Sequence, residues 1–264
     1  MKHHTTSFSL FTAVSLIVTL AGVSACSSAP PPAPPAQPAS AGKKVDAATA
    51  GSIAGKVTFD GAQPAAETIK MTTDPNCVAN AGPNPQSDAV LVGADKSVKN
   101  AFVHIKAGLD SGYSFDTPKN PVVLNQVGCV YTPRVVGLQV GQSIEVVNGD
   151  NTLHNVHALP MQNQEFNQGQ QFRGMKLTKT FTVPEVMVRF KCDVHGWMAA
   201  WVGVTTHPFF AITGADGTFE LKGVPPGTYT VEAWHEKFGT RTTQVTVGPS
   251  QAQTASFTFT ADSK

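Results

Sequence analysis

Short segments of β-forming residues, each ended by glycine, proline, asparagine or aspartate, run through most of this 264-residue chain. The clearest run is the one that follows Pro121, VVLNQVGCVYTPRVVGLQVGQSIEVVNGDNTLHNVHALP. No long stretch shows the 3.6-residue period of an amphipathic helix, so the chain is expected to be all-β. Turn residues divide the run into strands expected near 121–125, 128–132, 135–140, 143–148 and 154–159.

Further strands are expected on both sides of this run. GSIAGKVTFDG, from Gly51, and SVKNAFVHIKAG, from Ser97, precede it. In the C-terminal part, FFAITGADGTFELKGVPPGTYTVEAWHE predicts three strands joined by GADG and GVPPG turns, and TTQVTV and ASFTFT add two more. Residues 74–87, DPNCVANAGPNPQS, are expected to be rich in turns, and the glutamine- and asparagine-rich residues 161–174 are expected to form a loop.

The N-terminal residues predict the cellular location of the protein rather than a part of its folded domain. Residues 1–26 combine a basic tip, an apolar run and small residues before Cys26, which is the pattern of a secretory signal peptide. The ending VSAC resembles a bacterial lipobox, which implies lipidation of Cys26 and an anchor in the bacterial cell envelope. Ser27 at the next position favours the outer membrane, facing the periplasm or the cell surface. An ordinary signal peptide or a single membrane helix is the alternative.

The composition of the residues after Cys26 limits the kinds of partner that the protein can have. Residues 27–51 are rich in proline and alanine and predict an extended tether. The formal net charge of the whole chain is +1, which favours neither nucleic acid nor an acidic partner. Of four cysteines, Cys77 and Cys129 are expected to form a disulfide in an oxidising compartment, with two free thiols as the alternative. The chain contains no CxxC pair, which argues against a zinc ribbon.

The segment KCDVHGWM places Cys192, His195 and Met198 three positions apart between two expected strands. A thiolate, an imidazole and a thioether together suit copper. Taken singly, these residues could be a buried thiol, a surface histidine and a core methionine. A second imidazole could come from His154, which starts a strand directly after a polar loop. His157, three positions further, is expected to face the opposite side of that strand.

Residues 111–206 resemble a cupredoxin of the plastocyanin and amicyanin kind. NGDNTLHNVH is similar to the family's first-histidine motif, and CDVHGWM is similar to the short ligand loop of amicyanins. The resemblance implies a Greek-key β-sandwich that holds one type 1 copper, with His154, Cys192, His195 and Met198 as ligands. It also implies that Asn155 links the two ligand-bearing loops by hydrogen bonds; an ordinary turn asparagine is the alternative.

Residues 52–110 together with 207–262 resemble the carboxypeptidase regulatory-like domain, a prealbumin-type β-sandwich. In that family the opening strand looks like GSIAGKVTFDG, which here lies far upstream of the matching C-terminal hairpins. This separation predicts that the cupredoxin-like domain is inserted in the second sandwich. Independent domains packed side by side are the alternative.

These features predict a membrane-anchored blue copper protein that transfers electrons through the exposed edge of His195. Leu153, Pro160, Gly196 and Trp197 would form an apolar rim around that edge. The expected partner is a redox protein, such as a c-type cytochrome or a membrane oxidoreductase. The chain is expected not to be an enzyme, because it lacks the His-x-His motifs of multicopper oxidases and nitrite reductases. The alternative is a surface binding, structural or copper-storage lipoprotein in which the metal only stabilises the fold.

Overall fold

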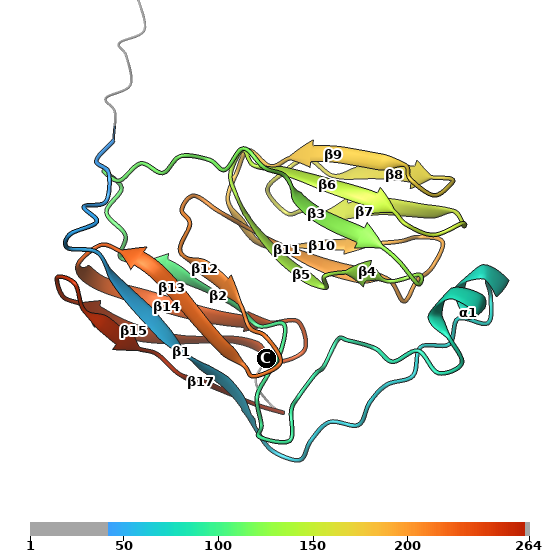
Figure 1. Ribbon diagram of the computed structural model, residues 1–264, viewed down its shortest axis with the longest axis horizontal. Helices are drawn as coiled ribbons and strands as arrows, with labels where there is room; N and C mark the ends of the chain where they lie inside the picture. The colour runs from blue at the N-terminus through green and yellow to red at the C-terminus, as the bar shows by residue number, and fades with distance from the viewer. Residues whose placement is uncertain (1–41, 262–264) are drawn as a thin grey trace, which may run out of the picture. The chain divides into compact units, whose positions relative to one another are not determined.

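The structure is a computed structural model that describes residues 42–261. The predicted signal peptide, the lipidation site Cys26 and the predicted tether up to residue 41 lie outside the described residues. Residues 42–261 contain seventeen strands and one short helix (Figure 1), which confirms the all-β prediction. Within that range no helix has the length and apolar character needed to cross a membrane.

Two four-stranded sheets form the first β-sandwich, which is built from segments near both ends of the described chain. In one sheet, β1 pairs with β13 in antiparallel and with β16 and β17 in parallel orientation. In the other sheet the strand order is β12-β2-β14-β15. The strands are β1 (Gly51–Asp60), β2 (Phe102–Ala107), β12 (Phe210–Ile212), β13 (Thr218–Val224), β14 (Gly227–His235), β15 (Gly239–Val247), β16 (Ala252–Thr254) and β17 (Phe257–Thr260). Ile53, Phe59, Val103 and Phe259 belong to the hydrophobic cluster between the sheets.

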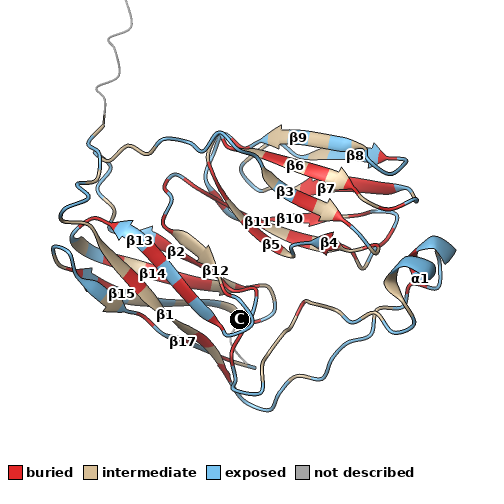
Figure 2. Ribbon diagram, in the orientation of Figure 1, coloured by how far each residue is buried: buried red, intermediate tan, exposed pale blue. Residues whose placement is uncertain are grey.

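The second β-sandwich is formed by the strands between residues 122 and 205. One sheet has the order β5-β11-β10-β7-β8 and the other has the order β4-β3-β6-β9. The strands are β3 (Val122–Gln126), β4 (Tyr131–Thr132), β5 (Val135–Gln139), β6 (Ser143–Asn148), β7 (His154–Leu159), β8 (Phe166–Gln170), β9 (Lys176–Thr180), β10 (Glu185–Lys191) and β11 (Ala199–Thr205). Along β6, buried residues such as Ile144 and Val146 alternate with less buried ones, as a strand with one face toward a core requires (Figure 2).

Two elements differ from the sequence-based expectation. The turn-rich stretch contains the helix α1 (Pro75–Ala81), which starts after Asp74 because the Asp74 carboxylate accepts a hydrogen bond from Asn76 N at 2.8 Å. A proline at the first helical position also suits this start. The expected glutamine-rich loop contains β8, which pairs with β7 from His154 opposite Gln170 to Ala158 opposite Phe166.

Helix α1 also shifts the boundary predicted between the sandwiches. Residues 52–110 were expected to belong to the first sandwich. Met71 and Cys77 instead belong to the hydrophobic cluster of the second sandwich, and Ile69 and Ala81 pack against it. The segment around α1 therefore covers the second sandwich before the chain enters β2.

Side chains from both sandwiches contact each other. Arg134, which precedes β5, forms ion pairs with Glu236 and Asp88. The rings of Trp201 and Trp234 lie 5.1 Å apart between centroids. Phe102 packs so closely on β11 that a Cβ atom at Gly203 would lie 2.4 Å from its ring. A glycine is therefore required at this position of β11.

The last residues of the predicted tether contact the first sandwich and its neighbouring loop. Lys43 N donates a hydrogen bond to Gly112 O at 2.7 Å, and Lys43 Nζ lies 4.9 Å from the centre of the Tyr113 ring. Asp46 N-terminal to β1 accepts a hydrogen bond from Ala50 N through its backbone oxygen at 2.9 Å. From Lys43 onward, the predicted tether is therefore attached to the folded part of the chain.

Candidate metal centre

The loop between β10 and β11 folds back on itself. Its two ends lie side by side, since Lys191 at the end of β10 pairs with Ala199 at the start of β11. Met198 N donates a hydrogen bond to His195 O at 2.9 Å, and Cys192 N donates one to Met198 O at 3.4 Å. This closed loop keeps Cys192, His195 and Met198 buried at one end of the second sandwich.

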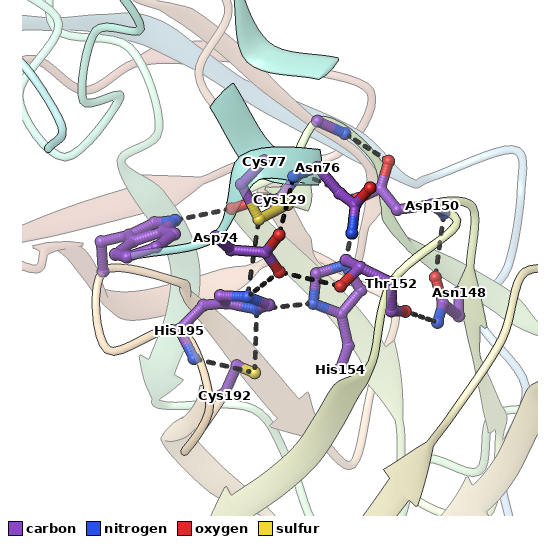
Figure 3. Close-up of a disulfide and its surroundings, with 12 residues drawn as sticks. Asp74, Asn76, Cys77, Cys129, Asn148, Asp150, Thr152, His154, Cys192 and His195 are labelled. Atoms are coloured by element: carbon purple, nitrogen blue, oxygen red, sulfur yellow. Dashed lines mark hydrogen bonds and ion pairs between the residues drawn. A yellow bond between two sulfur atoms is a disulfide. The ribbon is translucent and has the colours of Figure 1, made fainter. Parts of the chain in front are cut away.

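His154 reaches the same place from the neighbouring strand. It is the first residue of β7, which pairs with β10, and its side chain is fully buried. Its Nδ1 atom lies 3.0 Å from Nδ1 of His195, and the Cys192 sulfur lies 3.8 Å from that same His195 nitrogen (Figure 3). One donor atom from each of the three residues lies within 4.8 Å of the other two. Two imidazoles and one thiol thus converge on a single point.

Each histidine is held from its far side by a carboxylate. Asp150 Oδ2 lies 3.0 Å from Nε2 of His154, and Asp74 Oδ2 lies 3.0 Å from Nε2 of His195. A carboxylate can only accept a hydrogen bond, so both histidines carry their proton on Nε2 in the neutral state. The two Nδ1 atoms therefore face each other, 3.0 Å apart, where a shared proton or a nearby metal cation can offset their repulsion. Carboxylate-backed histidines are characteristic of metal ligands.

The thiol at the centre has a lowered pKa. Burial raises the pKa of Cys192, but hydrogen bonds from His154 and from backbone N–H groups outweigh burial and hold this pKa below its usual value. The donors include Asn155 N and His195 N, each 3.4 Å from the sulfur. A lowered pKa favours the thiolate, which is the form that binds metal.

The two supporting carboxylates are themselves fixed. Asp150 accepts hydrogen bonds from Gly128 N at 2.9 Å and Cys129 N at 2.8 Å. Asp74 accepts one from Thr152 Oγ1 at 2.8 Å. Burial raises the pKa of Asp74, but its hydrogen bonds from Thr152, Asn76 and His195 outweigh burial and lower the pKa to about 2. Both aspartates are therefore ionised acceptors near neutral pH.

Sequence reasoning missed both aspartates. The available signals were weak: Asp150 lies four residues before His154, and Asp74 stands before a proline at the start of a seven-residue helix. Neither spacing belongs to a ligand motif. A carboxylate that holds a histidine becomes visible only when the loops are placed in space.

Asn155 lies between the two ligand-bearing segments. Besides its backbone bond to the Cys192 sulfur, its side-chain oxygen accepts a hydrogen bond from Asp193 N, and its side-chain nitrogen donates to Asp193 Oδ2 at 3.1 Å. It thus joins the start of β7 to the loop after β10. His157 instead contacts Asp193 and Glu165 with its two ring nitrogens, at 2.9 and 2.8 Å, and is separate from the buried donors.

Met198 ends the loop and is buried in the same hydrophobic cluster as Cys192. Two other groups of possible metal-binding residues share atoms with the disulfide: Cys77, Cys129 and His195, and Cys129, Asp150 and His154. The sulfur atoms of an intact disulfide carry no charge, so within the described part of the chain we assign the donor set to His154, Cys192 and His195.

The predicted disulfide is confirmed, and its position corrects the expected electron port. Cys77 in α1 is bonded to Cys129, with 5.5 Å between their Cα atoms. Cys77 Sγ lies 3.5 Å from Nε2 of His195, and that ring is only 1% exposed. The edge of His195 was expected at the surface, but α1, Asp74 and the disulfide cover it (Figure 3). The sequence could not show this, because the covering segment lies about a hundred residues upstream.

The four residues expected around that edge lie in different surroundings. Leu153 and Gly196 are exposed, whereas Pro160 and Trp197 are half-buried. Trp197 contacts His195, with 5.2 Å between the ring centres, and its indole N–H donates to Cys129 O at 2.9 Å. Trp197 is therefore the rim residue that the structure connects to the buried histidine.

Comparisons with known proteins give partial matches. Residues 200–260 match the model of the carboxypeptidase regulatory-like domain. No curated protein sequence matches the chain. Among solved structures, a purple cupredoxin from Nitrosopumilus maritimus is 19% identical over 32% of this chain and 99% of its own, with a TM-score of 0.28. A mutant of amicyanin is 18% identical over 39% of this chain and 97% of its own, with a TM-score of 0.30. TM-scores this low assign no function.

A third match contradicts one prediction. A Cu-containing nitrite reductase from Thermus scotoductus SA-01 is 24% identical over 37% of this chain, with a TM-score of 0.30. The matched part spans 25% of the reductase chain. The prediction that the chain is not an enzyme rested on the missing His-x-His motifs. With an enzyme among the structures that match, that exclusion is wrong and is withdrawn.

Proposed function

We propose that the second sandwich binds one type 1 copper ion and that the protein transfers electrons. The observation that carries this proposal is the convergence of His154, Cys192 and His195, with the Nδ1 atoms of the two histidines 3.0 Å apart and a carboxylate behind each ring. When bound there, copper would supply a centre that gains and loses one electron. Met198, buried at the end of the same loop, would add a weaker thioether donor.

The residues around the centre would keep the same geometry in both oxidation states. Asp150 and Asp74 hold the two imidazoles, and Asn155 holds the thiolate and the loop. His154, Cys192, His195 and Met198 are each at most 1% exposed, so water is excluded from the donors. Fixed donors and a dry site reduce the rearrangement that accompanies a change of charge, which favours electron transfer.

The location and partner are part of the proposal. We infer that Cys26 is lipidated and anchors the protein in the bacterial cell envelope, because VSAC ends a signal-like segment. Ser27 at the next position favours the outer membrane. A redox protein in the same compartment, such as a c-type cytochrome or a membrane oxidoreductase, would exchange electrons with it.

The test is the absorption and electron spin resonance spectrum of the copper-loaded chain. The wild type should show the intense visible absorption of a thiolate bonded to copper, and Cys192→Ser should lose this absorption while remaining folded. His157→Gln is the matched control and should keep it, because the His157 ring nitrogens contact the carboxylates of Asp193 and Glu165 and not the buried donors. An absorption that survives in Cys192→Ser would refute the ligand assignment.

A further inference from the structure

The proposed electron transfer needs a route from the buried centre to the surface, and the structure closes the expected one. Nε2 of His195 faces Asp74 at 3.0 Å and Cys77 at 3.5 Å, and both belong to the segment that covers this ring. A partner could contact His195 only if α1, which the disulfide Cys77–Cys129 holds in place, moved away from the ring. A neighbour of His195 that does reach the surface must therefore take this role.

Trp197 is such a neighbour. It is two residues from His195, and the two rings are in contact with 5.2 Å between their centres. The hydrogen bond from its indole N–H to Cys129 O, at 2.9 Å, fixes the ring. A fixed aromatic ring in contact with a ligand gives a short path through bonds and van der Waals contacts. Trp197 thus connects the centre to whatever lies on its outer side.

On that outer side lies a groove of about 630 Å³. Trp197 and Trp201 line it from the second sandwich, and Glu236 and Lys237 line it from the first. Trp201 in turn contacts Trp234, with 5.1 Å between ring centres. The groove therefore joins aromatic side chains next to the metal centre to a surface that both sandwiches share.

The groove is positively charged. Lys70, Arg189 and Lys237 line it, and none of these three side chains has an ion-pair partner among residues 42–261. Arg134 also lines it, but its partners Glu236 and Asp88 carry one negative charge more than Arg134 offsets, so the excess of positive charge in the groove is small. Glu67 is the remaining carboxylate of the lining. The balanced charge of the whole chain gave no indication of an acidic partner, because it averages over this local excess of cations.

Building on the proposed function, we propose that this groove is the electron-transfer surface and that its partner is a redox protein with an acidic face. Carboxylates of the partner would pair with Lys70, Arg189 and Lys237 and place its redox group against Trp197. Unpaired cations beside an aromatic contact attract such a face at long range and orient it. This groove replaces the His195 edge as the port.

The first test needs no copper. Poly-L-glutamate should bind the metal-free full chain in detergent at low ionic strength and change its tryptophan fluorescence. Arg189→Gln combined with Lys237→Gln should weaken this binding on the order of tenfold, because two of the three unpaired charges are lost. Lys119→Gln combined with Lys222→Gln removes the same charge elsewhere and should weaken it less than about twofold.

The second test measures electron exchange. The reduced, copper-loaded chain gives one electron to hexacyanoferrate(III), which becomes hexacyanoferrate(II). At low salt this anion should react on the order of tenfold more slowly with the groove double variant than with the wild type, and high salt should remove the difference. Trp197→Leu should slow the reaction at every salt concentration while the copper spectrum stays the same.

The outcomes separate this proposal from the proposed function. Missing thiolate–copper absorption in the wild type would refute the copper centre, whereas the binding of poly-L-glutamate to the metal-free chain would still test the groove. Equal losses in the groove and control double variants would overturn the groove as the docking surface. Citrate that competes as strongly as poly-L-glutamate at equal carboxylate concentration would show a small-anion site, and that result would also overturn the acidic protein partner.

Discussion

Two deeply buried histidines, His235 in the first sandwich and His154 in the second, lie in opposite surroundings. His235 at the end of β14 stacks on Phe238 with 4.4 Å between ring centres, and its Nε2 atom has no hydrogen-bond partner in the described part of the chain. His154 at the start of β7 is as deeply buried, but its Nε2 atom is held by Asp150 at 3.0 Å. The first histidine lies in an aromatic core and the second lies in a polar site.

The pKa values express the same difference. Burial lowers the pKa of His235 to about 4, so this ring stays neutral. Burial also acts to lower the pKa of His154, but Asp150 and Cys192 outweigh it and raise the pKa to about 8. Burial alone makes a histidine inert. A fixed carboxylate on one nitrogen makes the other nitrogen a directed donor, and this distinguishes a ligand from a core residue.

The largest expected effect is the loss of copper when the directed histidine is removed. His154→Gln should lower copper affinity by more than roughly a hundredfold. The loss of only a hydrogen-bond partner of a metal-bound histidine already lowers affinity by up to about that factor, and the loss of the ligand itself should cost more. His235→Gln should leave copper affinity unchanged, although it lowers stability. Copper titration against a competing chelator measures both variants, with circular dichroism as the check on folding. Similar losses of affinity in the two variants would show that the contrast between the histidines is unrelated to metal.

The second effect concerns the disulfide, which only the second sandwich has among residues 42–261. Cys77 and Cys129 are 52 residues apart, and a link of this length stabilises a fold by about 4 kcal/mol through the unfolded chain. Cys77→Ser combined with Cys129→Ser should lower the free energy of unfolding by about that amount. It should also release α1, so that His195 reacts with an imidazole-modifying reagent.

Two measurements decide this prediction. Denaturant unfolding gives the free energy, and mass spectrometry of the modified chain locates the reaction. Val78→Ala changes an exposed residue of the same helix and serves as the control, with little effect on either measurement. If His195 stays protected from the reagent without the disulfide, then Asp74 and packing alone hold α1 over the His195 ring.

The sequence contained most of the β-structure and little of what surrounds the candidate metal centre. Alternating strands and their turns are local patterns, so the all-β class was predictable, and the cysteine count allowed the disulfide. The seven residues of α1 are too few to show a helical period, and β8 is polar because it pairs at an edge of its sheet. Neither element could be read from hydrophobic pattern.

The covered state of His195 was out of reach for a different reason. It depends on Asp74 and Cys77 coming to lie over a loop that the chain forms about a hundred residues later. The charge of the groove has the same origin, because Lys70, Arg189 and Lys237 are far apart in the sequence. Both properties arise from packing between residues far apart in the sequence, which composition and local motifs do not reveal.

The third effect is the response of the metal-free chain to pH. An unfolded histidine titrates near 6.5, so the depressed pKa of His235 gives stability that is complete above pH 6.5 and is lost as pH falls toward 4. The expected loss is on the order of 3 kcal/mol. The raised pKa of His154 acts oppositely, because its contribution is complete below pH 6.5 and is lost as pH rises through about 8. Unfolding free energies of the wild type and His235→Phe between pH 7.5 and 4.5 test this, and equal acid sensitivity would contradict it.

The smallest effect separates a supporting carboxylate from a merely nearby one. Asp150→Asn keeps an oxygen that can accept from Gly128 N or Cys129 N, but it replaces the charge that holds Nε2–H of His154 with a neutral amide. Copper affinity should fall roughly 10- to 100-fold, as is usual when a partner of a metal-bound histidine is lost. Asp193→Asn alters a carboxylate in the ligand loop that contacts Asn155 and His157 but neither His154 nor His195, and it should change the affinity less than about twofold. Asp150 acts on the metal site only through the His154 ring. Equal copper affinities of the Asp150→Asn and Asp193→Asn variants would therefore mean that the Asp150 carboxylate does not orient this ring. His154 would then differ from His235 only in its neighbours and not in its chemistry.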